Sequence, residues 1–435
     1  TIYTDGTFGD MVKGGAAYDG NAYNNELTVL RGAIGAGGTF DAYVSGGFAD
    51  NDGNVYGNTL TINGSIADTV INGYANGGEA AFGDVYNNTL IVNGGSITAG
   101  AYGGYAGPDG LGAATGKAYN NRMFVYGGQI GSSVAGGRSD QQGDVYNNTL
   151  TIEGGEFDAG ASVYGGRSGE GNVYDNTLTI SGGAFNGREI YGGMANGVTT
   201  GGEARGNKVF ITSVTDAGDV FGGYSTGSNV YGNSVNISGQ VAGNIYGGYT
   251  ADGNATGNSL DIYGILDTQS VSGGYSVAGQ ATGNSVLIRQ SAQINSGVSL
   301  FGGYSGDSSD AFSGTTLTIE NRAPMTFAEI QYFKNYNLTL PAGLTTGGTL
   351  ITISGATPTY LDNLADNSQT AKFTLNVAGN DPLRNPGDYF TIISNTDTFS
   401  GNKYTSTTTG LRGIGVRYTY TLENQSDRLP GSPEA

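Results

Sequence analysis

VYNNTLTIEGG (residues 145–155) is one copy of a stretch that returns along the whole chain. Near-copies read VYGNTLTINGS (55–65), VYNNTLIVNGG (85–95), VYDNTLTISGG (173–183) and VYGNSVNISGQ (230–240). Each copy has an asparagine two residues before a Leu or Val. Aligned on that residue, the copies lie 25 to 33 residues apart, at Asn25, Asn58, Asn88, Asn121, Asn148, Asn176, Asn207, Asn233, Asn258 and Asn284. A repeat of this length indicates a solenoid, a propeller or an array of small units.

Each repeat contains three recurring pieces. The first is the strand quoted above, and the second is a short Gly-x-apolar piece such as Ser96-Ile97 or Gln129-Ile130. The third is an apolar pair followed by Gly-Gly, as in AYGGYA (101–106), VYGGRS (163–168), IYGGYT (245–250) and LFGGYS (300–305). A propeller blade needs roughly 40 residues, and no stretch has the i, i+3, i+4, i+7 pattern of helical repeats. The sequence therefore predicts an all-β fold, a parallel β-helix of about eleven coils over residues 1–321.

Composition restricts the class of protein. Glycine accounts for 81 of 435 residues, but a Gly-X-Y period is absent and there are only 8 prolines, which argues against collagen and against a disordered linker. The net charge of −19 disfavours nucleic acid and anionic lipid. With no cysteine there is no disulfide framework. No apolar run is long enough to span a bilayer, and the first residues do not have the pattern of a signal peptide.

The repeated asparagine has a structural interpretation. In NTLTI, Asn148 has the same strand parity as Leu150 and Ile152, so it is expected to point inward just after a bend. A buried amide needs hydrogen-bond partners, and coils stacked about 4.8 Å apart would supply them as a ladder of asparagines. Asparagine also tolerates left-handed turn conformations. The Gly-Gly pairs are expected to be corners that require a positive φ.

The repeat fades near residue 321, where glycine becomes rarer and strands lengthen. We expect residues 322–424 to form a C-terminal β cap that covers exposed strand edges. Residues 425–435 are polar and contain two prolines, which is typical of a linker. Insertions fall in glycine-rich turns such as 107–117 and 196–206, and these turns are expected to project as loops.

Several of these motifs resemble a known family. The pieces GNSL (257–260) and GGYS (273–276), followed by LTLP (338–341) and PGD (386–388), resemble the passenger domains of bacterial autotransporters (type V secretion), over nearly the whole chain. The resemblance implies a right-handed β-helix with a C-terminal cap, next to the linker that enters an outer-membrane barrel. It also implies a location at the cell surface or outside a Gram-negative-type bacterium. Since neither a signal peptide nor a barrel is present, it implies a released, cleaved or truncated passenger.

Residues able to carry catalysis are few. The absence of histidine excludes hydrolytic triads and histidine-based acid–base chemistry, and no zinc site of the usual Cys or His kind is possible. A glycosidase would need two carboxylates about 5–10 Å apart. Candidate pairs are Asp50 with Asp52, Glu153 with Glu156, and Asp307 with Asp310, although each lies in an ordinary acidic loop. The DNDGN stretch (50–54) is similar to a calcium loop but has no distal glutamate. We predict no cofactor and no metal.

Two outward rows are possible contact surfaces. Tyr105, Tyr224, Tyr249, Tyr275 and Tyr304 follow the Gly-Gly pair, and Phe48, Arg138, Arg167 and Met194 take the equivalent position in other coils. Stacked tyrosines either stabilise a solenoid or hold a sugar ring or a partner side chain. The second row is Thr-rich, as in Thr149/Thr151 and Thr177/Thr179. It is interrupted by Arg122/Phe124, Lys208/Phe210 and Asp261, which argues against an ice-binding grid.

The leading hypothesis is a non-enzymatic adhesin that binds a host or bacterial surface protein or glycan, or a second copy of itself. One alternative is a β-helical glycosidase or polysaccharide lyase, which needs a cleft with clustered acids. Another is a purely structural surface stalk. Neither the receptor nor the oligomeric state follows from the sequence.

Overall fold

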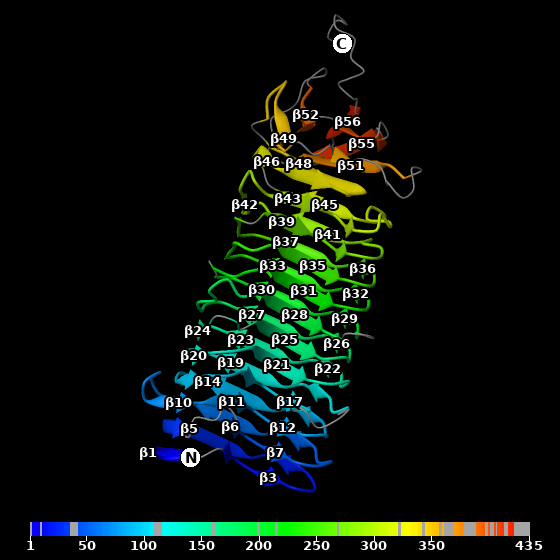
Figure 1. Ribbon diagram of the computed structural model, residues 1–435. Helices are drawn as coiled ribbons and strands as arrows, with labels where there is room; N and C mark the ends of the chain where they lie inside the picture. Colours follow the sequence, from blue (N-terminus) through cyan, green and yellow to red (C-terminus); the bar gives the residue numbers. More distant parts are fainter. Residues whose placement is uncertain are drawn as a thin grey trace, which may run out of the picture.

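The computed structural model describes residues 2–8, 11–34, 42–107, 115–158, 160, 162–197, 201–213, 216–267, 269–320, 323–341, 344–355, 359–360, 369–377, 389–395, 399–400, 404–405, 407–412 and 416–421. These residues are all-β and form a solenoid of about 11 turns, with β1 and the last described strands at opposite ends of a rod (Figure 1). Neighbouring coils pair in parallel along the rod. Within the described residues there is no helix long and apolar enough to cross a membrane.

Three long sheets form the sides of the rod. Sheet A comprises β1 (Ile2–Phe8), β5 (Glu26–Ile34), β9 (Thr59–Ile62), β10 (Thr69–Ile71), β14 (Thr89–Val92), β15 (Ser96–Ile97), β19 (Arg122–Val125), β20 (Gln129–Ile130), β23 (Thr149–Ile152), β24 (Glu156–Phe157), β27 (Thr177–Ile180), β30 (Lys208–Ile211), β33 (Ser234–Ile237), β37 (Ser259–Ile262), β41 (Ser285–Ile288), β45 (Thr316–Ile319), β48 (Asn335–Leu340), β51 (Ala371–Val377) and β54 (Tyr404–Thr405). Sheet B comprises β2 (Met11–Lys13), β3 (Ala16–Ala17), β6 (Ala42–Ser45), β7 (Phe48–Ala49), β11 (Gly73–Asn76), β12 (Glu79–Ala80), β16 (Ala101–Tyr102), β17 (Tyr105–Ala106), β21 (Val134–Ser139), β25 (Val163–Ser168), β28 (Ile190–Ala195), β31 (Val220–Ser225), β35 (Ile245–Thr250), β39 (Ser270–Ser272), β40 (Tyr275–Ser276), β43 (Ser299–Phe301), β44 (Tyr304–Ser305) and β47 (Glu329–Gln331). Sheet C comprises β4 (Ala22–Tyr23), β8 (Val55–Tyr56), β13 (Val85–Tyr86), β18 (Ala118–Tyr119), β22 (Val145–Tyr146), β26 (Val173–Tyr174), β29 (Ala204–Arg205), β32 (Val230–Tyr231) and β36 (Ala255–Thr256).

Smaller sheets complete the described strands. They are β34 (Gln240–Val241) with β38 (Ile265–Leu266) and β42 (Gln293–Ile294); β46 (Met325–Phe327) with β49 (Thr349–Ile353) and β52 (Thr391–Asn395); β50 (Thr359–Tyr360) with β53 (Phe399–Ser400); and the antiparallel pair β55 (Thr407–Arg412) and β56 (Val416–Thr421). Stacking does not stop where the sequence repeat fades, because β45, β48, β51 and β54 continue sheet A in parallel. The hairpin β55–β56 lies against β51 at the C-terminal end of the rod.

The quoted stretch forms two strands rather than one. Val145 and Tyr146 belong to sheet C, Thr149–Ile152 belong to sheet A, and Asn147 between them has a φ of 55°. The same left-handed turn recurs at Asn24, Gly57, Asn87, Asn120, Asp175, Gly206, Gly232, Gly257, Gly283 and Gly314. The left-handed residue therefore precedes the repeated asparagine, so tolerance of left-handed conformations does not explain why the repeated residue is asparagine.

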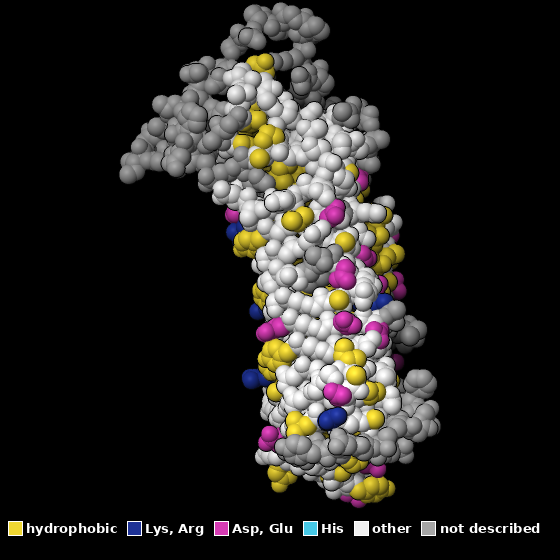
Figure 2. Space-filling model, turned by 90° about the vertical axis from the view of Figure 1, so that its left-hand side faces the viewer, with side chains coloured by type: hydrophobic (Ala, Val, Ile, Leu, Met, Phe, Trp, Pro, Cys, Tyr) yellow, Lys and Arg dark blue, Asp and Glu magenta, His cyan; other side chains and the backbone are white. Residues whose placement is uncertain are grey.

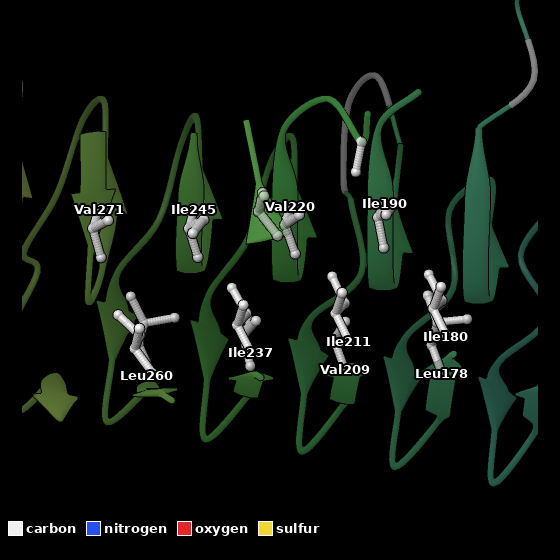
Figure 3. Packing of buried hydrophobic residues seen from close by; sticks show 14 of the residues in the cluster. Leu178, Ile180, Ile190, Val209, Ile211, Val220, Ile237, Ile245, Leu260 and Val271 are labelled. Atoms are coloured by element: carbon white, nitrogen blue, oxygen red, sulfur yellow. The ribbon is translucent and has the colours of Figure 1, made fainter. Parts of the chain in front are cut away.

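The core is a set of apolar columns parallel to the rod axis. Leu150 pairs in register with Leu178, and Ile152 with Ile180, all four fully buried. Figure 3 shows these columns meeting a second set from sheet B, which includes Ile190, Val220 and Ile245. Alternate residues of each short strand point inward, so every coil adds the same few side chains to one continuous interior.

The prediction that the Gly-Gly pairs need a positive φ was wrong. None of the pairs in sheet B has a left-handed φ. The reason for glycine is space instead. A Cβ on Gly137 would lie 2.5 Å from the amide of Asn148, and a Cβ on Gly136 would lie 2.6 Å from the carbonyl oxygen of Gly165 in the next coil. The second glycine makes room for the repeated asparagine, and the first allows close approach of the next coil.

This packing predicts the outcome of Gly166→Ala. Its Cβ would lie 2.6 Å from the buried amide of Asn176, so the coil must shift. Overpacking of this kind typically costs about 1–3 kcal/mol, and the unfolding midpoint in urea, followed by circular dichroism, should fall. The matched control is Gly297→Ala, where an added Cβ meets nothing within 4 Å. Equal midpoints for the two variants would contradict the steric explanation.

Candidate functional site

The ten repeated asparagines form one amide ladder, in which Asn25 is half-buried and the other nine are buried. Asn121 donates both its backbone N–H and its Nδ2 to Oδ1 of Asn148, each at 3.0 Å, and Asn148 does the same to Asn176 at 3.0 and 2.9 Å. The remaining Nδ2 hydrogen of Asn148 goes to the carbonyl oxygen of Ala118 at 2.9 Å. The same pattern links Asn25, Asn58, Asn88, Asn121, Asn148, Asn176, Asn207, Asn233, Asn258 and Asn284.

Since these amides are fully used inside the rod, the ladder is structural. Backbone hydrogen bonds between coils continue on both sides of the left-handed turn, from the Asn147 N–H to the Tyr174 carbonyl and from the Thr149 N–H to the Asn121 carbonyl. Between them, the N–H of the repeated asparagine is accepted by the side-chain oxygen of the next coil. One coil beyond Asn284 the equivalent position is Thr315, which is also buried.

The predicted tyrosine stripe lies on the outer face of sheet B. Tyr224, Tyr249, Tyr275 and Tyr304 stack in register, with ring centroids 5.1, 4.9 and 4.5 Å apart. Tyr105 occupies the same row but is separated from them by Arg138, Arg167 and Met194. The stripe therefore consists of one continuous stack and one distant member.

A second aromatic row on sheet B did not emerge from the sequence analysis. Tyr164, Tyr191, Phe221 and Tyr246 stack three residues before the first row, at 5.1, 4.8 and 5.0 Å. Rings of the two rows meet edge to face, as Phe221 and Tyr249 do with an interplanar angle of 84°. Tyr164, Tyr191 and Phe221 are nearly buried, because the glycines between the rows leave flat backbone on which the rings lie. The signal was the apolar pair before each Gly-Gly.

Tyr105 is held in a polar cluster. Its hydroxyl donates to Oδ2 of Asp140 at 2.5 Å, and Arg138 Nε contacts Oδ1 of the same carboxylate at 2.5 Å. Arg138 also donates to the hydroxyl of Tyr102, and its guanidinium lies 4.8 Å from that ring's centroid. Ala135 leaves a gap in the second row at this coil, and Arg138 fills it. The described groups of this cluster are thus satisfied by one another.

A third aromatic row, also absent from the sequence analysis, follows sheet C. It contains Tyr23, Tyr56, Tyr86, Tyr119, Tyr146 and Tyr174, whose successive centroids are 4.8–5.2 Å apart with planes within 7° of parallel. We name these six residues the tyrosine ladder. Arg205 continues it with its guanidinium 4.1 Å from the centroid of Tyr174. The signal was the tyrosine two residues before the repeated asparagine.

Tyr86, Tyr119 and Tyr146 of the tyrosine ladder stay protonated at neutral pH. Partial burial, followed by the charge of Asp84, raises the pKa of Tyr119 to about 12. Burial also raises the pKa of Tyr86 and Tyr146. Their hydroxyls therefore remain available as hydrogen-bond donors. Because the ring faces are covered by neighbouring rings, the ladder presents ring edges and hydroxyls to solvent.

The candidate acid pairs differ in their surroundings. Asp307 accepts hydrogen bonds from Ser305 Oγ at 2.7 Å and from the Ser309 N–H, and these bonds lower its pKa to about 2. Oδ1 of Asp310 accepts the N–H groups of Phe312 and Ser313, each at 2.9 Å. Both aspartates thus hold the turn that contains them.

The other two pairs, Asp50 with Asp52 and Glu153 with Glu156, lie in surface turns or strands. Among the residues that the structure describes, no group of three or more acids is arranged to hold a metal ion.

One buried carboxyl group stands out. Glu79 is 3% exposed and lies in the row of sheet B between Phe48 and Tyr105. Asn76 Nδ2 donates to its Oε2 at 2.7 Å, and Lys13 Nζ lies 3.2 Å from the Phe48 ring centroid. Burial raises the pKa of Glu79 to about 7, although the Asn76 hydrogen bond and the Lys13 charge oppose the shift.

The side of the rod in Figure 2 is mostly uncharged polar side chains and backbone, with scattered acidic, basic and hydrophobic groups. Comparisons of the chain with protein-family models, with curated proteins and with solved structures give no match.

Replacing one rung of the amide ladder should destabilise the rod. In Asn148→Ala, the backbone N–H and Nδ2 of Asn121 both lose their acceptor in a buried site, at about 1–3 kcal/mol for each unsatisfied group. The thermal midpoint should fall well below that of Asn93→Ala, which removes an exposed amide hydrogen bond to Asn63. Similar midpoints for both variants would contradict the role assigned to the ladder.

The raised pKa of the buried Glu79 predicts that the free energy of unfolding depends on pH. A folded-state pKa raised to about 7 means that the folded chain binds the proton more tightly than the unfolded chain. Stability is therefore lost as pH rises from about 4.5 to 7. Glu79→Gln, which can still accept from Asn76, should match the parent chain at pH 4.5 and exceed it at pH 8 by at most about 3 kcal/mol.

Melting curves at the two pH values test this prediction, with the exposed Glu153→Gln as control. A Glu79→Gln variant whose midpoint differs from that of the parent chain equally at both pH values would contradict it.

Proposed function

We propose that this chain is the passenger domain of a bacterial autotransporter, and that it acts as a non-enzymatic adhesin at the cell surface or in the extracellular space. The β-solenoid fold is compatible with such a passenger. The proposed partners are a protein or glycan on a host or bacterial surface, or a second copy of the chain.

The length of the rod supports a contact role. About 11 turns at about 4.8 Å per coil give a stacked region on the order of 50 Å long. A partner can therefore contact several coils at once, and weak contacts repeated along a stiff surface add up without a large loss of conformational entropy.

The observation that carries the proposal is the tyrosine ladder on sheet C. Six coils in succession present a tyrosine to solvent in one fixed orientation. Stacking immobilises each ring before any partner arrives, so binding costs little side-chain entropy. Tyrosine offers apolar area and a hydroxyl together, which suits protein and glycan surfaces alike.

The test displays the chain on a strain that neither adheres nor aggregates by itself, and then compares Tyr86→Thr/Tyr119→Thr/Tyr146→Thr with the parent chain. Threonine suits this row, because Thr256 pairs in register with Tyr231. Adhesion to cultured cells or settling of the displaying cells should fall several-fold at equal display. Replacing the exposed Tyr18 and Tyr263 by Thr serves as the matched control.

Two outcomes would count against this proposal. If the triple variant adheres like the parent chain, the tyrosine ladder is not part of the contact surface. If the parent chain itself confers neither adhesion nor aggregation, the adhesin function is wrong and the stalk alternative is favoured.

A further inference from the structure

A shallow polar groove follows the corner where sheet C turns into sheet A. It has a volume of about 470 Å³ and is lined by Asn87, Thr89, Asn120, Arg122, Asn147 and Thr149. Three successive coils each contribute the left-handed residue and the first residue of the following strand. The groove therefore repeats its polar groups along the rod at the coil spacing of about 4.8 Å.

The asparagines of the groove are not required by the backbone. The same left-handed position is glycine at Gly57, Gly206, Gly232, Gly257, Gly283 and Gly314. Asn87, Asn120 and Asn147 have φ values of 57°, 56° and 55°, which glycine adopts without strain. Three consecutive coils thus carry an amide side chain where the turn could do without one.

These side chains have unused hydrogen-bonding capacity. Within the described residues, the amides of Asn87, Asn120 and Asn147 make no hydrogen bond, in contrast to the amides of the buried ladder. The hydroxyls of Thr89 and Thr149 make none either, and the exposed Arg122 guanidinium has no ion pair there. The groove therefore holds one cation among neutral hydrogen-bond donors and acceptors.

We propose that this groove binds a segment of an extended acidic polysaccharide, in which a uronic acid carboxylate pairs with Arg122. Arginine matches a carboxylate with two parallel hydrogen bonds. The amides and hydroxyls on both sides suit the sugar hydroxyls of neighbouring residues. Asp175, the left-handed residue of the coil after Asn147, would repel an anion and limits the site at that end.

A polysaccharide fits better than the other linear polymers. A bound peptide strand would pair with an open sheet edge, whereas the groove lies across coils whose edges are already paired. Nucleic acid needs many cations along its phosphates, and the groove has one. The inference deepens the proposed adhesin function by naming a ligand class, and it rests on that function for its biological role.

The test measures binding of oligogalacturonides to residues 1–435 by calorimetry, with methyl-esterified oligomers of the same length as the ligand control. The parent chain should bind the acidic oligomers at least tenfold more tightly. Arg122→Thr should abolish this preference, because it removes the cation that pairs with the carboxylate. Threonine suits this position, since the register partners Thr89 and Thr149 are threonines already. Lys208→Thr, which removes an exposed cation from the same strand row outside the groove, should retain it.

A second variant separates side chains from backbone. Asn87→Gly/Asn120→Gly/Asn147→Gly keeps the left-handed turns but removes the amides, and it should weaken binding at least tenfold. Asn24→Gly, in the same row outside the groove, should bind like the parent chain.

Three results would overturn the proposal that the groove binds acidic polysaccharide. They are no binding of the acidic oligomers, equal binding of the esterified oligomers, or equal losses of affinity in Arg122→Thr and Lys208→Thr. In the display assay, adhesion that persists without oligogalacturonide binding would overturn the groove and leave the adhesin proposal standing. Oligogalacturonide binding without adhesion would overturn the adhesin proposal and leave the groove proposal standing.

Discussion

The structure depends on one contact, in which the amide of each repeated asparagine lies against the second glycine of a Gly-Gly pair. At the turn between sheet C and sheet A, the backbone N–H of the repeated asparagine is accepted by the asparagine side chain of the next coil instead of by a backbone carbonyl. The amide can occupy that place because the facing strand has no Cβ there. The Asn repeat and the Gly-Gly repeat are therefore two parts of one interaction. Neither residue would be explained by the local conformation of its own segment.

Much of this could be predicted from the sequence. The interval between repeats and the strand parity of Asn148 were enough to predict stacked coils and an inward amide, since both depend on period and alternation alone. The reason for the glycines could not be predicted, because glycine serves both for positive φ and for close approach, and one sequence alone does not distinguish the two. A bend before Asn148 was expected, but the residues ahead of it were not recognised as a separate strand of sheet C, and the tyrosine ladder was missed with them. The continuation of sheet A through β48 and β51 was hidden because stacking persists after the repeated letters are lost.

The inside and the outside of the rod use the coil spacing differently. Inside, the spacing lets amides and aliphatic side chains satisfy one another completely, so these residues have nothing left for a ligand. Outside, the same spacing stacks tyrosines whose edges remain accessible, and it aligns polar groups that nothing in the described residues satisfies. Candidate contact residues are therefore found where the repeat places a side chain that the fold itself does not need. The acids at Asp307 and Asp310 show the opposite case, since their turn uses both.

The head-to-tail equivalence of the amide rungs bears on how such a rod can change in length. Each rung accepts from the coil before it and donates to the coil after it in the same way. A duplicated segment of one repeat would thus find compatible neighbours on both sides, and a deleted one would leave compatible ends. Unequal recombination between copies could lengthen or shorten the rod by about 4.8 Å at a time without altering any interior side chain.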